Sequence, residues 1–263
     1  MDNENIEKIK KRELNSGYIV AHAVTCMVNV NKNNVTTKKE IYYIIGIDIL
    51  GKRRLLTYGI DNDDSRYWIN KLEDIKVRGV KRIFFTNIKD NSKFSKAFKI
   101  VFQDTQLIPS VNEVVIGLQK FFSDSYTQTV YNDLAKLYIQ NDYIKFEYEK
   151  SLFFEKYCDN KVVSLLVKPS IDAIDKVYDY PLNIRKMLFT YYYIRDFYKE
   201  IRKKHKHYGI ISDINEFTKE LIPYIQKIEK SMWCSKKELL DIIDSLHELY
   251  GDEVVELMSE AKR

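Results

Sequence analysis

The segment Tyr67–Phe102 reads YWINKLEDIKVRGVKRIFFTNIKDNSKFSKAFKIVF, and its pattern predicts a helix, a strand, a turn and a second helix. Apolar residues recur at helical spacing as far as Ile75, and Gly79 can adopt the left-handed conformation that ends a helix. Ile83–Phe85 is apolar and β-branched or aromatic, as expected of a strand buried on both faces. Helical spacing returns in Lys93–Phe102. Functional residues are expected at the carboxyl end of the strand, where α/β proteins usually place their chemistry.

The composition is that of a folded chain in a reducing compartment. Hydrophobic residues make up 45% of the 263 residues and aromatic residues 13%, which is enough for a packed core. Cys26, Cys158 and Cys234 are odd in number and lack metal-ligand spacing, so neither disulfides nor a zinc site is expected. No apolar run is long enough to cross a membrane, and the charged amino terminus does not resemble a signal peptide. We therefore expect a cytoplasmic protein with no membrane partner.

Charge is distributed unevenly along the chain. Ser235–Arg263 contains 4 Lys or Arg against 8 Asp or Glu and carries a net −4, so the rest of the chain carries +9. A basic body is compatible with nucleic-acid binding. A solvated, lysine-rich surface explains the same numbers equally well.

Outside the opening segment, the pattern predicts strands early in the chain and helices later. β-Branched and small residues indicate three closely spaced strands that form an antiparallel meander, with a polar turn at Asn31–Lys39. The expected strands, including one after the second helix, are Tyr18–Val30, Glu40–Asp48, Arg53–Ile60 and Gln106–Ile108. Helical spacing fills Ser110–Tyr180, and further helices are expected at Pro181–Lys206, at Asp213–Lys230, and on both sides of Gly251 after a capping box at Ser235–Glu238.

Several of these motifs resemble the Mutator-like transposases of bacterial and archaeal insertion sequences. The motif WxxxLxDxKxRGVK at Trp68–Lys81, with the strand, turn and phenylalanine-containing helix that follow, resembles that family. Asn132–Tyr138, Phe146–Tyr157 and the end of the region at Trp233 also resemble family segments. The resemblance covers about Gly17 to Trp233. It implies an RNase H-like mixed sheet interrupted by an all-helical insertion.

The resemblance and the patterns together predict five parts. They are a charged arm (1–16), an RNase H-like core (17–110), a helical insertion (111–182), returning core helices (183–233) and an acidic pair of added C-terminal helices (234–263). The resemblance also implies that the chain lacks the amino-terminal region with which such transposases recognise element ends.

The resemblance further implies an Asp-Asp-Glu triad that binds two Mg²⁺ ions, but alignment places other residues at all three positions. The first acid, in the middle of the first strand, is replaced by His22. The second, after the Ile83–Phe85 strand, is replaced by Lys89, and the third by Arg195. Positive side chains repel Mg²⁺, which gains its affinity largely from carboxylates. We therefore expect no metal, no cofactor and no enzymatic activity.

Each replacement also has an ordinary structural interpretation. His22 can be a hydrogen-bonded core histidine, Lys89 a solvated turn residue, and Arg195 a side chain stacked on Tyr191 or Tyr198. The remaining acids nearby are Asp48, Asp90 and Asp196. Asp90 and Asp196 are expected to pair with Lys89 and Arg195, although a rearranged carboxylate set that retains metal-dependent activity is left open.

The expected function is that of a catalytically inactive, domesticated transposase derivative that binds DNA without sequence preference. The expected phosphate contacts are the basic residues Lys89, Arg195, Arg202, Lys203, Lys204 and Lys206. In a prokaryotic cytoplasm such a protein could associate with the nucleoid. The alternative is a protein-interaction module without DNA binding, which uses its tyrosine-rich helices and acidic carboxyl-terminal helices. A homodimer is also left open.

Overall fold

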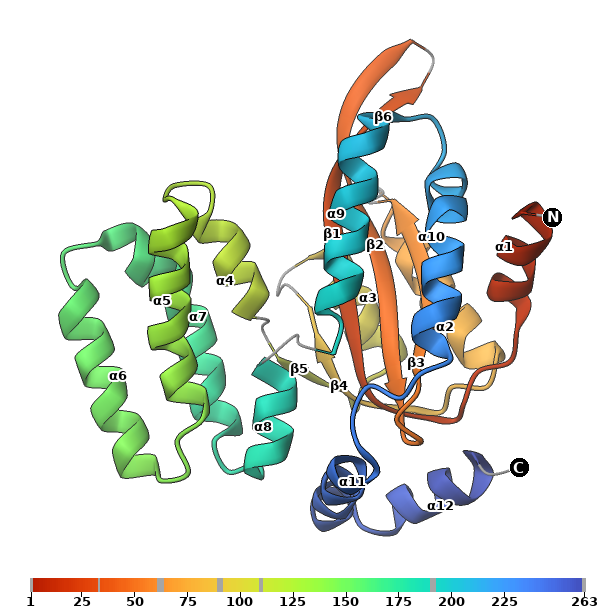
Figure 1. Cartoon of the computed structure of the whole chain (residues 1–263). Coiled ribbons are helices and arrows are strands. Elements are labelled where there is room, and N and C mark those ends of the chain that lie inside the picture. Colours follow the sequence, from red (N-terminus) through yellow and green to blue (C-terminus); the bar gives the residue numbers. More distant parts are fainter. Residues whose placement is uncertain are drawn as a thin grey trace. The chain divides into compact units, whose positions relative to one another are not determined.

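The structure is a computed structural model that describes residues 2–32, 34–60, 64–88, 92–108, 111–189 and 193–261 (Figure 1). Lys89 and Asp90 lie outside the described residues. The chain divides into two compact units. Unit 1 comprises Met1–Leu107 and Tyr193–Arg263, and unit 2 comprises Ile108–Tyr192. Each is described by itself.

Unit 1 contains a mixed sheet with helices on both faces. Its strands are β1 (Gly17–Lys32), β2 (Val35–Asp48), β3 (Arg53–Ile60), β4 (Arg82–Asn87), β5 (Gln106–Ile108) and β6 (Ile210–Ile211). Its helices are α1 (Asp2–Lys11), α2 (Ser65–Val77), α3 (Lys93–Val101), α9 (Arg195–Tyr208), α10 (Ile214–Glu229), α11 (Lys236–Tyr250) and α12 (Asp252–Ala261). The mixed α/β class predicted from the sequence is confirmed.

Strand β1 lies at the centre of the sheet, in the order β3-β2-β1-β4-β5. It pairs antiparallel with β2 and parallel with β4, and its far end pairs with β6. The predicted turn at Asn31–Lys39 is wrong in length, because β1 and β2 continue to the pair Lys32–Val35. The β-branched Val35, Thr36 and Thr37 favour an extended backbone, which lengthens the hairpin.

Helices α2 and α3 cover one face of the sheet, as the opening segment predicts. Trp68 is fully buried, and its ring lies 4.9 Å from Phe94 and 5.1 Å from Tyr42 of β2. Gly79 has a φ of 115°, and an added Cβ would lie 2.8 Å from the carbonyl oxygen of Leu14, so glycine is required there.

Helices α9 and α10 cover the opposite face (Figure 1). Because side chains alternate along a strand, Tyr43 points away from Tyr42 and toward these helices. Its hydroxyl hydrogen-bonds to Thr218 of α10 at 2.7 Å, and its ring packs edge-on against Phe197 of α9.

The single helix predicted at Pro181–Lys206 is wrong. Helix α8 (Leu182–Phe189) ends before a turn at Tyr193 and Ile194, and α9 begins at Arg195. Aromatic and β-branched residues have lower helix propensity, and both turn residues are buried. Unit 2 consists of α4 (Val111–Leu118), α5 (Asp124–Tyr138), α6 (Tyr143–Tyr157), α7 (Lys161–Val177) and α8.

The predicted carboxyl-terminal helices are confirmed as α11 and α12. The Ser235 hydroxyl accepts a hydrogen bond from the Glu238 amide at 3.2 Å, and Gly251 ends α11 with a φ of 62°. Tyr250 packs 4.7 Å from Phe84 of β4, and Glu253 pairs with Arg82 at 3.1 Å. In the described part of the chain, no helix is both long and apolar enough to cross a membrane.

Replacing Leu246 with alanine tests whether α11 belongs to the cooperative core of unit 1. Leu246 is fully buried, so Leu246→Ala should lower the free energy of unfolding by about 3 kcal/mol. Leu240→Ala is the control, because Leu240 is 57% exposed on the same helix, and it should change stability by less than about 0.5 kcal/mol. Urea unfolding followed by tryptophan fluorescence measures both. Equal effects of the two substitutions would show that α11 is not part of that core.

Candidate functional site

A buried group of polar side chains lies at the middle of β1, where the resemblance places the first catalytic acid. His22 pairs in register with Asn87, the last residue of β4. Tyr193 from the turn before α9 and Tyr198 from α9 complete the group, which we call the histidine cluster. All four residues are buried, with exposures between 1% and 7%.

Hydrogen bonds connect the members of the histidine cluster. His22 Nε2 lies 3.3 Å from the Tyr198 hydroxyl, and Nδ1 lies 3.5 Å from the Tyr193 hydroxyl. The Tyr193 hydroxyl donates to Asn87 Oδ1 at 3.2 Å, so it can accept a hydrogen bond from a protonated Nδ1. The Tyr198 hydroxyl, which lies beside Nε2, also donates a hydrogen bond to the carbonyl oxygen of Ala23 at 3.4 Å. Both tyrosine rings meet the imidazole edge-on.

Burial determines the charge of this cluster. It lowers the pKa of His22 to about 3, and a hydrogen bond with Asn87 opposes the shift. His22 is therefore neutral at pH 7. Its ordinary structural interpretation, a hydrogen-bonded core histidine, agrees with this geometry.

The residues next to His22 are tyrosines rather than Arg195. Arg195 is exposed at the start of α9, and within the described residues its side chain forms no ion pair or hydrogen bond. Among the described residues, the expected pairing of Arg195 with Asp196 is not observed. Burial lowers the pKa of Arg53, and Tyr224 and the charge of Asp196 oppose that shift.

Asp48 has a structural role at the other end of the strand pair. It is opposite Tyr18 in the β1–β2 register, whereas His22 is opposite Ile45. Its carboxylate accepts hydrogen bonds from the backbone amides of Leu50 and Lys52 at 3.0 and 2.8 Å, which closes the β2–β3 turn. Burial raises its pKa, and these hydrogen bonds oppose the shift. Among the described residues no group of three His, Cys, Asp or Glu could hold a metal ion.

Residues 2–233 match the family model described as Transposase, Mutator family. The chain belongs to this family. The resemblance identified from Trp68–Lys81 is thereby confirmed. No curated protein matches the chain. Helices α11 and α12 lie beyond the region that the Mutator family model matches.

In this Mutator-family chain, α9 presents a basic face to solvent. Arg195, Lys199 and Arg202 are exposed and follow one another at spacings of four and three residues, so they lie on one side of the helix. We call them the basic face of α9. Lys203 is also exposed, whereas Lys204 pairs with Glu220 at 3.3 Å. The side chain of Lys206 lies outside the described residues.

Helix α9 runs beside the β1–β2 hairpin, which adds further positive charge. Burial raises the pKa of the Cys26 thiol to about 11, and the charge of Arg202 opposes this shift. Burial and the charge of Lys38 both lower the pKa of His205. The amide of Asn29 donates to the carbonyl oxygen of Gly209 at 3.4 Å. Charged side chains of α9 and of the hairpin therefore lie close enough to shift each other's neighbouring titratable groups.

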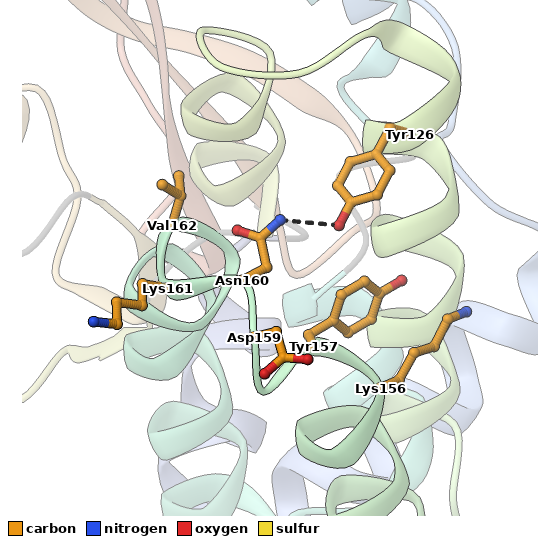
Figure 2. Close-up of a pocket in the computed structure, with 7 residues that line it drawn as sticks. All are labelled: Tyr126, Lys156, Tyr157, Asp159, Asn160, Lys161 and Val162. Carbon is orange, nitrogen blue, oxygen red and sulfur yellow. Dashed lines mark hydrogen bonds between the residues drawn. The ribbon is translucent and has the colours of Figure 1, made fainter.

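Unit 2 has an open depression where α5, α6 and α7 meet (Figure 2). Asn160 donates to the hydroxyl of Tyr126 at 3.1 Å, as the dashed line in Figure 2 shows. Lys156 and Tyr157 both hydrogen-bond to Asp133, at 2.6 and 2.8 Å. These hydrogen bonds connect α5 to α6 and to the residue that precedes α7.

Sequence reasoning found His22 but missed its partners Asn87 and Tyr193. Asn87 ends a largely apolar strand. A polar residue at that position, opposite a polar residue of the neighbouring strand, indicates a buried hydrogen-bonded pair. Tyr193 lies inside the segment that was aligned as helix, and its place beside His22 depends on the turn that separates α8 from α9.

Substituting His22 should change how stability depends on pH. The pKa of His22 falls from about 6.5 in the unfolded chain to about 3 in the folded protein, so the unfolded state binds a proton first as the pH falls. The contribution of neutral His22 is complete above pH 6.5 and is lost between about pH 6.5 and 3, at about 1.4 kcal/mol per pH unit. His22→Gln should remove this slope in urea unfolding measured between pH 4.5 and 6. Parallel curves for the two proteins would contradict a buried neutral histidine.

Proposed function

We propose that this Mutator-family protein is a catalytically inactive, domesticated transposase derivative with an RNase H-like core, and that it binds DNA without sequence preference. Three observations support the RNase H-like core. An antiparallel three-stranded meander precedes the helix–strand alternation, β1 is central, and helices cover both faces of the sheet. Unit 2 interrupts this arrangement between β5 and α9.

The histidine cluster carries the proposal of inactivity. A two-metal transposase needs converging carboxylates, because Mg²⁺ prefers charged oxygen ligands. The position on β1 instead has a neutral, buried imidazole that is hydrogen-bonded to two tyrosines. Asp48 and Asp196 act elsewhere in unit 1. The described residues of the cluster therefore do not fit a Mg²⁺ ion.

The purified protein should not nick or join DNA. Supercoiled plasmid incubated with Mg²⁺ or Mn²⁺ should remain supercoiled, because no carboxylate is available at the centre of β1. Agarose gel electrophoresis gives the readout. Nicking that is lost in Asp90→Ala would overturn the proposal and favour a rearranged carboxylate set.

The basic face of α9 supports the proposal of DNA binding. Its three cations are exposed and have no ion-pair partner among the described residues, so they can approach phosphates without first breaking an internal contact. Lys38 and Lys203 add positive charge nearby. Contacts of this kind give affinity without sequence information.

The salt dependence of binding tests this surface. The triple variant Arg195→Gln, Lys199→Gln and Arg202→Gln should lower the slope of log affinity against log salt by about three. Fluorescence anisotropy with random-sequence duplex DNA at several salt concentrations measures the slope.

The matched control changes three exposed lysines away from α9, namely Lys96, Lys236 and Lys237, to glutamine. It removes the same charge and should leave most of the slope unchanged. Equal slopes for the two triple variants would contradict a specific role for the basic face, and absence of DNA binding by the parent protein would favour the protein-interaction alternative.

One observation favours that alternative, a protein-interaction module. Ile144, Tyr148 and Leu152 recur every four residues on α6 and are 78%, 61% and 40% exposed. An exposed apolar row of this kind suits a protein contact. The acidic carboxyl-terminal helices suit it less well, because Glu253 and Glu260 already pair with Arg82 and Lys81.

A further inference from the structure

Helix α6 of unit 2 is apolar on two opposite sides. Phe146, Phe153 and Tyr157 are buried on its inner side, where α6 packs against α5 and α7. The exposed apolar row that is centred on Tyr148 lies on the outer side, because a helix turns by about 100° per residue. A surface helix ordinarily presents polar residues to solvent, and a helix with apolar residues all round is typical of one that is covered on every side. In the described part of the chain, only the inner side of α6 is covered.

Two charged residues lie at the ends of this apolar row. Lys145 follows Ile144, and Glu155 lies three residues after Leu152, so the helical turn keeps both on the side of Tyr148, within about a third of the helix circumference. Both charged side chains are exposed, and among the described residues neither has a hydrogen-bond or ion-pair partner. We call Ile144, Lys145, Tyr148, Leu152 and Glu155 the outer face of α6.

The two charges of the outer face do not stabilise the helix that carries them. Lys145 is in the first turn of α6, and Glu155 is in its last turn. A helix has a partial positive charge at its amino end and a partial negative charge at its carboxyl end, so both residues are at the unfavourable end. The same arrangement favours a second helix of opposite direction, because its charges then lie beside unlike charges.

An identical copy of α6 in antiparallel orientation complements the outer face. Lys145 and Glu155 lie at equal distances, five residues each, from the midpoint between Tyr148 and Leu152. A two-fold axis through that midpoint therefore places Lys145 of one copy opposite Glu155 of the other, and Tyr148 opposite Leu152. Each contact occurs twice, and each apolar row covers the other.

We propose that the outer face of α6 is a homodimer interface, in which two copies of the chain pair antiparallel through this helix. The apolar rows provide buried area, and the two Lys145–Glu155 pairs fix the direction and the register. One helix pair is a small interface, so we expect a dissociation constant in the micromolar range. The proposal goes beyond DNA binding and does not depend on it, because the basic face of α9 belongs to unit 1.

Sedimentation equilibrium of the full chain, without DNA, tests the proposal at protein concentrations from about 1 to 200 μM. The parent protein should pass from monomer to dimer across this range. A protein that stays monomeric at the highest concentration would overturn the proposal, and the apolar row would then be left for a different protein partner.

Charge reversal tests the pairing itself. Lys145→Glu should weaken the dimer at least about tenfold at low salt, because both Lys145–Glu155 contacts become repulsive. The substitution also places an acidic residue in the first turn of α6, which favours the helix, so a weaker dimer would not reflect a damaged helix. Glu155→Lys should weaken the dimer to a similar extent. The double variant Lys145→Glu with Glu155→Lys should dimerise within about threefold of the parent protein, because the attraction is restored with its signs exchanged.

Lys120→Glu is the matched control, because Lys120 is exposed in the turn after α4 and does not belong to α6. It makes the same change of charge and should dimerise like the parent protein. Equal weakening by Lys120→Glu and Lys145→Glu would show an effect of net charge and overturn the assignment to α6. A dimer that neither single reversal weakens would place the interface elsewhere. A double variant as weak as the single variants would overturn the antiparallel pairing.

Discussion

The structure of unit 1 depends on the burial of β1 between two strands and two layers of helices. Its backbone pairs with β2 from Tyr18 to Lys32 and with β4 from Gly17 to His22, and buried side chains of the sheet meet α2 and α3 on one face or α9 and α10 on the other. A polar side chain at such a position must be neutral and hydrogen-bonded. His22 meets this requirement through Tyr193 and Tyr198, whereas a lone carboxylate there would need a cation beside it.

The helix–strand–helix segment could be predicted from sequence because its signals are local. Trp68, Leu72 and Ile75 recur at helical spacing, Gly79 has a positive φ that residues with a side chain rarely adopt, and the strand between the helices is short and apolar. The length of the β1–β2 hairpin was not predictable in the same way. Polar residues at its end suggest a long turn, while the pairing of Thr36 and Val35 depends on the neighbouring strand.

Only part of the candidate site could be predicted. Alignment placed His22 at the centre of β1, and the absence of acids there followed from composition alone. Its charge could not be known, because the pKa of a histidine depends on burial that no local pattern reveals. The break between α8 and α9 had the largest consequence. It brings Tyr193 to His22 and leaves Arg195 exposed, so the residue aligned with the third acid lies on a surface rather than in the cluster.

Side chains rather than another strand close the free edge of β3. An exposed edge strand invites pairing with another chain, and here side chains occupy its backbone groups instead. Arg12 donates to the carbonyl oxygen of Leu55 at 2.9 Å, Glu229 accepts from the Leu55 amide at 2.8 Å, and Arg78 donates to the carbonyl oxygen of Leu56. Arg12 and Arg78 are themselves paired with carboxylates, Glu229 and Asp74 respectively, so the charges that close the edge are balanced where they lie.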